Sequence, residues 1–300
     1  MEGKTVLFTG ASRGMGRFAA IELARLGAQI LVVGHNEARG TAAVQEIGGT
    51  RRSAEFLRAD MGDAAEVCAL ATAVLARSEP VHVLIHSAGG MPPAEARTPE
   101  GVDRGFALNF LGPFLLTRLL EERLVASAPA RVIAVGSRAH WLLKSVDVDS
   151  LIRPVEASPP LGSKQRGSHQ MRSYQAAKLA VTTWVYDLAR RWAGRGVTAN
   201  LLDPGMVKNQ MGEQFEGPAL TRFLMSQVIP FFVAAGMERG SRQYVRLAAD
   251  PTLASVSGAY FVSGKEKKQG SSTLSLDHAV QQRINEVAET WAAPFLAADG

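Results

Sequence analysis

The sequence predicts an α/β protein with a single parallel sheet that is covered by helices on both faces. Short apolar segments alternate with amphipathic segments along most of the 300 residues, and this order is typical of repeated strand–helix–strand units. Residues 30–33 are apolar without interruption, and residues 81–85 are apolar apart from His82, which indicates strands buried on both faces. A glycine-rich turn joins the first strand to the first helix. These three observations predict a Rossmann-type fold with a doubly wound parallel sheet.

The predicted elements follow one another in a regular order. Strands are expected near residues 4–9, 28–34, 53–59, 81–87, 131–136, 197–203 and 258–262. Helices are expected near residues 14–26, 37–47, 63–77, 101–126, 172–194 and 239–249. The sheet should therefore contain about seven strands.

Residues 1–264 are expected to form one dinucleotide-binding and catalytic domain, because no interdomain linker is visible within them. The stretch 264–274 is rich in Lys, Gly and Ser, which is typical of a mobile connection. Beyond it, apolar side chains recur at helical spacing, at Leu276, Val280, Ile284, Val287 and Trp291. Residues 265–300 are therefore predicted to be a linker and a C-terminal amphipathic helix.

The glycine-rich turn at residues 9–16 is the expected binding site for a dinucleotide. Glycine at three positions permits a tight turn and a close approach of the backbone to a pyrophosphate. The N-terminus of the following helix presents free amides to the anion. We therefore expect cofactor contacts from Gly10, Ser12, Arg13, Gly14, Met15 and Gly16.

Tyr174 and Lys178 are the strongest candidates for chemistry. They are four residues apart in a predicted helix, so their side chains stand one turn apart on the same face. A phenol has a reference pKa near ~10. A neighbouring ammonium favours phenolate, so we expect Lys178 to lower the pKa of Tyr174 towards the range needed for proton exchange.

These two features, with three further motifs, resemble the short-chain dehydrogenase/reductase family from about residue 3 to residue 263. Residues 9–16 reproduce its Thr-Gly-x3-Gly-x-Gly turn, and residues 86–89 (His-Ser-Ala-Gly) stand where that family has Asn-Asn-Ala-Gly. The replacement by Ser87 puts one strand-packing hydrogen bond of the family in doubt. The remaining matches are Asn109, Ser137 and the pair Pro204-Gly205. Residues 109–117 and 137–140 are similar to the retinol-dehydrogenase-like branch.

The resemblance implies an oxidoreductase that transfers hydride between nicotinamide and a carbonyl or alcohol. In that mechanism Tyr174 exchanges a proton with the substrate oxygen, and Lys178 assists it and holds the nicotinamide ribose. Ser137 would bond the substrate oxygen, and Asn109 would anchor a water of the proton relay. General acid–base assistance of this kind is typically worth ~10² to 10⁴ in rate.

Further cofactor contacts are expected where predicted strands end, because open α/β sheets bind ligands at the carboxyl ends of their strands. The resemblance places Asp60 at the adenine ring, although a strand-end cap would also explain it. The complete set of these expected contacts is Asp60, Met61, Ser87, Ala88, Gly89, Pro204, Gly205 and Val207, together with Tyr174 and Lys178.

The end of the second strand bears on the choice between NADP(H) and NAD(H). His35 stands where phosphate-binding relatives often carry arginine, and Asn36 and Arg39 follow it. Arg13 occupies the other position that the resemblance associates with the 2′-phosphate, for which a guanidinium is a good partner. We expect a preference for NADP(H), with NAD(H) as the alternative. Glu37 is the residue that would favour NAD(H) instead.

Two segments are expected to shape the substrate site. Ser137 and Tyr174 are 37 positions apart in the sequence, and residues 141–172 between them contain several Pro and Gly residues, so we expect a largely irregular insertion at the active-site rim. Residues 206–237 are rich in Met, Phe and Ile and are expected to form a flap. This composition favours a bulky lipophilic, even polycyclic, substrate, although the same residues would also suit packing against the body or a homo-oligomer contact.

Composition excludes several other functions. The formal charge of +5 is scattered, so no nucleic-acid partner is expected. The histidines and the single cysteine show no metal-ligand spacing, and no metal is expected. One cysteine and the lack of a long apolar stretch or signal pattern favour an unprocessed cytoplasmic protein without a transmembrane segment. Two alternatives remain open: a non-catalytic nucleotide sensor on the same scaffold, and an epimerase or dehydratase.

Overall fold

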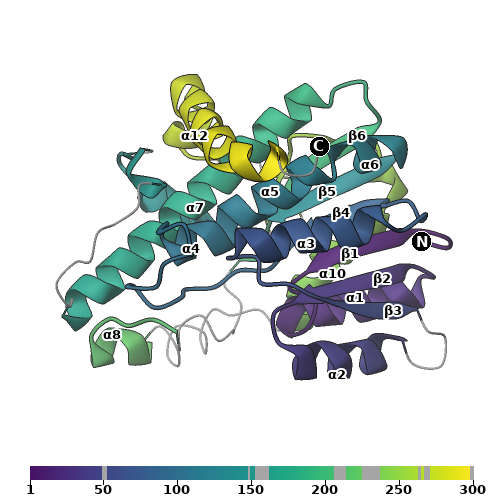
Figure 1. The fold of residues 1–300 in the computed structure, drawn as a ribbon, viewed down its shortest axis with the longest axis horizontal. Helices are drawn as coiled ribbons and strands as arrows, with labels where there is room; N and C mark the ends of the chain where they lie inside the picture. The colour runs from purple at the N-terminus through teal and green to yellow at the C-terminus, as the bar shows by residue number, and fades with distance from the viewer. Residues whose placement is uncertain are drawn as a thin grey trace.

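The structure is a computed structural model that describes residues 1–48, 53–147, 149–152, 162–205, 214–224, 237–262, 265–266 and 271–297. In these parts of the chain, eight strands form one sheet in the order β3-β2-β1-β4-β5-β6-β7-β8 (Figure 1). The strands are β1 (Thr5–Thr9), β2 (Gln29–Gly34), β3 (Ala54–Arg58), β4 (Val83–His86), β5 (Ala130–Val135), β6 (Val197–Asp203), β7 (Tyr260–Val262) and β8 (Lys265–Glu266). Strands β1 to β7 are parallel, which confirms the predicted doubly wound sheet.

Helices cover both faces of the sheet (Figure 1). One face packs against α3 (Ala64–Leu75), α5 (Gly112–Leu119) and α7 (Ser163–Arg191), and the other against α1 (Gly14–Arg25), α2 (Glu37–Gly48) and α10 (Met237–Ala249). Leu7 and Phe8, adjacent on β1, show why the strands are apolar throughout. Both are fully buried, but they belong to the hydrophobic clusters on opposite faces.

The segment between β4 and β5 differs from the single helix predicted over residues 101–126. It consists of α4 (Arg104–Phe106), a π-helical turn η1 (Ala107–Leu111), α5 and α6 (Glu121–Ala126). Asp103 caps the start by accepting a hydrogen bond from the Phe106 amide at 2.8 Å. The π turn carries Asn109, and such turns are frequent at functional sites because they redirect one side chain.

Helix α7 begins at Ser163, nine residues before the predicted start at 172. The expectation of a largely irregular insertion over 141–172 is therefore wrong for its last ten residues, and η2 (Arg138–Leu142) and η3 (Asp149–Leu151) add short 3₁₀ turns. Gly167, which suggested a loop, is instead a packing position. A Cβ there would lie 2.6 Å from the Gly217 Cα, so only glycine allows this contact. Figure 1 shows the early turns of α7 projecting beside α8 (Ala219–Phe223).

The C-terminal region contains more regular structure than the sequence predicts. Strand β8 pairs antiparallel with β7, and α11 (Thr273–Leu276) precedes α12 (His278–Ala297), so the connection 264–274 is not irregular throughout. Asp277 caps α12 by accepting from the Ala279 amide at 2.8 Å. Ile284 and Val287 of α12 are buried in the cluster that also contains α3, α5 and α7. A 3₁₀ turn, η5 (Pro251–Leu253), follows α10.

Candidate active site

The carboxyl ends of β1 and β4 are held together at one edge of the sheet. The Thr9 hydroxyl accepts hydrogen bonds from the Ser87 amide at 3.2 Å and the Ala88 amide at 3.3 Å. A Cβ on Gly10 would lie 2.6 Å from the Ala88 nitrogen. The glycine is therefore required by the close approach of two strand ends, at the point where the strand order reverses.

The glycine-rich turn leaves an open helix N-terminus. Gly10 and Gly14 adopt φ values of +80° and +57°, which favour glycine. A Cβ on Gly16 would meet the Gly10 oxygen at 2.6 Å, whereas Gly14 has no heavy atom within 4 Å of its Cβ position. Helix α1 begins at Gly14 without a side-chain cap. Its first amides can therefore receive a phosphate.

Ser137, Tyr174 and Lys178 come together, as the sequence predicts. Ser137 follows β5, and its hydroxyl accepts from the Ala139 amide at 3.2 Å. Tyr174 and Lys178 lie on α7, and the Lys178 Nζ is 5.5 Å from the centroid of the tyrosine ring. Lys178 is buried, and its Nζ donates to the Val135 carbonyl at 2.8 Å. A hydrogen bond links the side chains of Tyr174 and Ser137.

The electrostatics of Tyr174 differ from the sequence-based expectation. Burial, opposed by the hydrogen bond with Ser137 and assisted by the negative charge of Asp203, raises the pKa of Tyr174 to about 12. Burial also lowers the pKa of Lys178 to about 8, against the effect of Asp203. The expected lowering of the tyrosine pKa is therefore wrong for this structure, because desolvation of the phenolate exceeds the stabilisation that a neighbouring amine provides.

Asn109 holds the loop that follows β4. Its Nδ2 donates to the carbonyls of Gly90 and Gly105, each at 2.8 Å, and its Oδ1 accepts from the Gly90 amide at 3.3 Å. A Cβ on Gly89 would lie 2.7 Å from the same Oδ1. The side-chain amide of Asn109 is thus engaged with the backbone, and its role in anchoring a water stays a prediction.

The residues expected around the adenine and at the end of β4 have structural partners. Asp60 accepts from the Gly62 amide at 2.8 Å and pairs with Arg104 at 2.5 Å, which agrees with a strand-end cap. Met61 is buried in the core. The Ser87 hydroxyl bonds the Tyr244 hydroxyl of α10 at 2.8 Å. This bond anchors the end of β4 at the position where the sequence had put a hydrogen bond in doubt.

Basic side chains gather between the ends of β1 and β2. Burial lowers the pKa of Arg13, and the positive charge of Arg39 lowers it further, so the two guanidinium groups are close enough to repel. His35 and Arg39 are exposed, and Asn36 caps α2 by accepting from the Arg39 amide at 2.9 Å. Glu37 is also exposed, in the first turn of α2.

The turn after β6 carries Pro204 and Gly205, and Gly205 has a φ of +75°. The predicted contact Val207 lies outside the described residues, as do most apolar residues of the flap. Two apolar flap residues within the described part differ in solvent exposure: Phe215 is 7% exposed, whereas Phe223 is 56% exposed.

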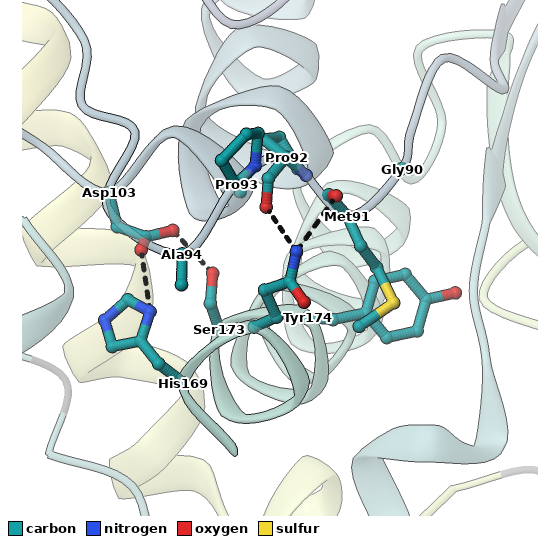
Figure 2. Close-up of a pocket in the computed structure, with 11 residues that line it drawn as sticks. Gly90, Met91, Pro92, Pro93, Ala94, Asp103, His169, Ser173 and Tyr174 are labelled. Carbon is teal, nitrogen blue, oxygen red and sulfur yellow. Dashed lines mark hydrogen bonds and ion pairs between the residues drawn. The ribbon is translucent and has the colours of Figure 1, made fainter. Parts of the chain in front are cut away.

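A small pocket, with a volume of about 10 Å³, adjoins Tyr174. Figure 2 shows Asp103 on one side of it, between Ser173, which donates to the carboxylate at 2.5 Å, and His169 at 3.7 Å. Gln170, also in the lining, donates to the Pro92 carbonyl at 2.9 Å and accepts from the Glu216 amide at 2.7 Å. This glutamine therefore ties α7 to the loop after β4 and to the flap.

Sequence reasoning missed Asp203, Arg138 and Gln170. Asp203 directly precedes Pro204, and Arg138 directly follows Ser137; the two side chains pair at 3.1 Å. The available signal was a carboxylate at the end of an otherwise apolar strand. Gln170 lay in the segment that we expected to be irregular, so its position one turn before Tyr174 could not be read from the sequence.

The described residues contain no cluster of three or more His, Cys, Asp or Glu side chains arranged to hold a metal ion. Nor does any described helix combine the length and the apolar character needed to cross a bilayer.

Residues 4–143 match the family model described as short chain dehydrogenase. Retinol dehydrogenase 14 of Mus musculus is 30% identical over 301 residues, covering 96% of this chain and 86% of that protein. Polyprenol dehydrogenase of Mus musculus is 34% identical over 269 residues, covering 86% of this chain and 75% of that protein. The crystal structure of a blue fluorescent protein from a metagenomic library, in complex with NADPH, is similar with a TM-score of 0.64 at 25% identity, covering 87% of this chain and 96% of that chain.

Proposed function

Because the chain belongs to the short-chain dehydrogenase family, in its retinol-dehydrogenase-like branch, we propose that it is an NADP(H)-dependent oxidoreductase acting on the carbonyl or alcohol group of a bulky lipophilic substrate. The observation that carries this proposal is the hydrogen-bonded pair Ser137 and Tyr174, with the Lys178 ammonium 5.5 Å from the tyrosine ring. A sensor without chemistry would not need a buried lysine beside a hydrogen-bonded phenol.

In the proposed mechanism, nicotinamide supplies or accepts the hydride when it is bound. Tyr174 holds the proton that is exchanged with the substrate oxygen, and its high pKa keeps the phenol protonated and ready to donate at neutral pH. Ser137 bonds the same oxygen and aligns it. Lys178 adds positive charge next to the phenolate that forms, since its Nζ is held against the Val135 carbonyl. The helix α1 N-terminus would bind the pyrophosphate.

The proposed preference for NADP(H) rests on charge. Arg13 and Arg39 lie close together at the end of β2, and such a pair favours a dianionic 2′-phosphate, which would relieve their mutual repulsion. The similar structure crystallised with NADPH supports the same choice.

The proposed lipophilic substrate rests on the flap composition and on relatives whose printed names are retinol and polyprenol dehydrogenase. The pocket beside Tyr174 has a volume of about 10 Å³, which is far below the ~300 to 1,000 Å³ usual for organic ligands. The proposed substrate therefore requires a larger site than this pocket. A cytoplasmic location also belongs to the proposal, supported by the single cysteine of the sequence.

The test is a panel of carbonyl compounds mixed with protein and NADPH or NADH, followed by nicotinamide absorbance. We expect oxidation of NADPH, with kcat/KM rising from acetone-sized to multi-ring carbonyls mainly through a lower KM. Similar kcat/KM for small and multi-ring substrates would refute the lipophilic site. No nicotinamide turnover with any member of the panel would favour the sensor or the epimerase instead.

A further inference from the structure

We propose that Asp203 is a positioning residue: its carboxylate links the turn of Ser137 to the turn of Pro204 and Gly205 and thereby holds Ser137 in place for the reaction. This inference rests on the oxidoreductase function proposed above. It concerns a residue at the end of β6 that neither touches the reacting atoms nor belongs to the motifs recognised in the sequence.

The surroundings of Asp203 fit an ionised carboxylate. Its side chain is 5% exposed. Its Oδ2 accepts from the Arg138 amide at 3.0 Å and from the Arg138 Nε at 3.1 Å, and its Oδ1 accepts from the Gly205 amide at 2.7 Å. The Tyr260 hydroxyl donates to Oδ2 at 3.5 Å. All these partners are donors, and an ionised carboxylate, which only accepts, satisfies them.

These bonds hold the backbone on both sides of Ser137. Before the serine, the Gly136 amide donates to the Leu202 carbonyl of β6 at 2.9 Å. After it, the Arg138 amide donates to Asp203. Two hydrogen bonds thus connect the turn of Ser137 to β6, and the second of them depends on the Asp203 carboxylate. The same carboxylate accepts from the Gly205 amide, so it links the turn of Ser137 to the expected cofactor turn.

The charge of Asp203 also acts on the two residues of α7. It raises the pKa of Tyr174, in addition to the larger effect of burial, and it opposes the lowering of the Lys178 pKa that burial causes. Removing the charge should therefore lower both pKa values. Arg138 partly neutralises Asp203 through its ion pair at 3.1 Å, so removing Arg138 should have the opposite effect.

Other titratable groups lie near Tyr174 or near Asp203. Lys178 on α7 and Tyr244 on α10 lie near Tyr174, and Asp103 and His169 line the pocket that adjoins it. His140 on η2 and Tyr260 on β7 interact with Asp203, as Arg138 does. Asp203 is the described carboxylate whose charge acts on the pKa of Tyr174. A change of this one residue therefore tests the charge without altering the proton donor itself.

The experiment measures kcat against pH for carbonyl reduction and for alcohol oxidation. Reduction needs the phenol and falls as pH rises through the tyrosine pKa, whereas oxidation needs the phenolate and rises through the same pKa. In Asp203→Asn, both transitions should move to lower pH by about one unit, as expected for loss of a nearby charge. In Arg138→Gln, both should move to higher pH. Asp203→Glu should keep the wild-type transitions with a lower kcat, because the longer side chain displaces the turn.

Asp187→Asn is the matched control. Like Asp203→Asn, it removes one negative charge, in this case from α7, the helix that carries Tyr174. Asp187 pairs with Arg190 at 3.4 Å and makes no contact with the site residues in any described interaction. Its pH profiles should coincide with those of the wild type. Coinciding profiles of Asp203→Asn and Asp187→Asn, in a wild type that is active, would overturn the inference.

A second measurement separates this inference from the proposed function. The chain has 4 tyrosines, so ¹³C-labelled tyrosine gives few signals, and loss of one in Tyr174→Phe assigns it. Its titration should move to lower pH in Asp203→Asn even if the protein turns over no carbonyl substrate. An unmoved Tyr174 titration would refute the role of Asp203. If Asp203→Asn does not fold, an Arg138→Gln titration that stays at the wild-type midpoint has the same consequence.

Discussion

At the scale of single residues, the proposed proton donor is a phenol that the protein keeps neutral. Burial raises the pKa of Tyr174 to about 12, so nearly all molecules carry the proton at neutral pH. The nearby Lys178, with its pKa lowered to about 8, is still largely protonated at pH 7. The pair thus combines a proton to donate with a positive charge that stabilises the phenolate left behind.

Replacing the phenol tests this assignment directly. Tyr174→Phe should lower kcat by ~10² or more, because general acid assistance is lost, while NADPH affinity changes little. Lys178→Ala should lower both kcat and the affinity for NADPH. Steady-state kinetics and fluorescence titration with NADPH measure the two quantities. Tyr186→Phe is the matched control on α7, since the Tyr186 hydroxyl bonds Ser271. A Tyr174→Phe variant as active as the control would mean that another group donates the proton.

The two arginines at the end of β2 make a second prediction at this scale. We expect NADPH to bind more tightly than NADH, and Arg13→Ala to remove most of the difference, because Arg13 is the more buried guanidinium of the pair with Arg39. Dissociation constants for both cofactors provide the measurement. Arg25→Ala is the control, because Arg25 is the last residue of α1 and pairs with Glu22 at the surface. Equal dissociation constants for NADPH and NADH in the wild type would contradict the assignment.

At the scale of elements, the glycine-rich turn combines two separate demands. Gly10 must accommodate the end of β4, since a Cβ would lie 2.6 Å from the Ala88 nitrogen. Gly14 faces open space and starts α1. Gly10 is therefore required by the packing of the sheet, whereas Gly14 leaves open space where the proposed cofactor phosphate would bind.

Alanine substitutions should separate these demands. Gly10→Ala should destabilise the protein by several kcal/mol, because a backbone clash is added to an unfavourable φ. Gly14→Ala, with φ strain alone, should cost about 1 to 2 kcal/mol but should weaken cofactor binding strongly. Urea denaturation of both variants measures the loss of stability, and titration with NADPH measures the loss of cofactor affinity. Equal losses of stability would show that the contact between Gly10 and Ala88 is not tight.

At the scale of the whole molecule, one buried histidine links stability to pH. His86 bonds the Thr117 hydroxyl at 2.8 Å, and burial lowers its pKa to about 3. Its unfolded pKa is near ~6.5. Below pH 6.5 the unfolded chain therefore takes up a proton that the native state refuses until about pH 3. Stability is fully present above pH 6.5 and declines as the pH falls through this window.

Between pH 7 and pH 5, His86 should cost the native state about 2 kcal/mol. Burial also lowers the pKa of His140, which acts in the same direction. Urea denaturation at the two pH values should therefore show a larger loss for the wild type than for His86→Asn. If both proteins lose the same free energy of unfolding, His86 does not stay neutral in the native state.

The order of the elements, the parallel sheet and the identity of the candidate catalytic residues followed from the sequence alone. These features depend on local patterns. An uninterrupted apolar run such as residues 30–33 indicates a strand covered on both faces, and the spacing of Tyr174 and Lys178 determines that they share a helix face. Their juxtaposition with Ser137 was implied by the family resemblance, since Ser137 follows a strand whereas the other two residues lie on a helix.

Only the tertiary structure decided how charge and burial combine at that edge. The direction of the Tyr174 pKa shift depends on how far the phenol is desolvated and on Asp203, which lies 29 positions away in the sequence on a different element. The early start of α7 depends on Gly167 packing against Gly217, a contact between distant segments. Desolvation and long-range contacts depend on which residues surround a side chain in the folded protein, and the order of residues in the chain does not specify these neighbours. They determine which protonation state of each candidate residue the protein stabilises.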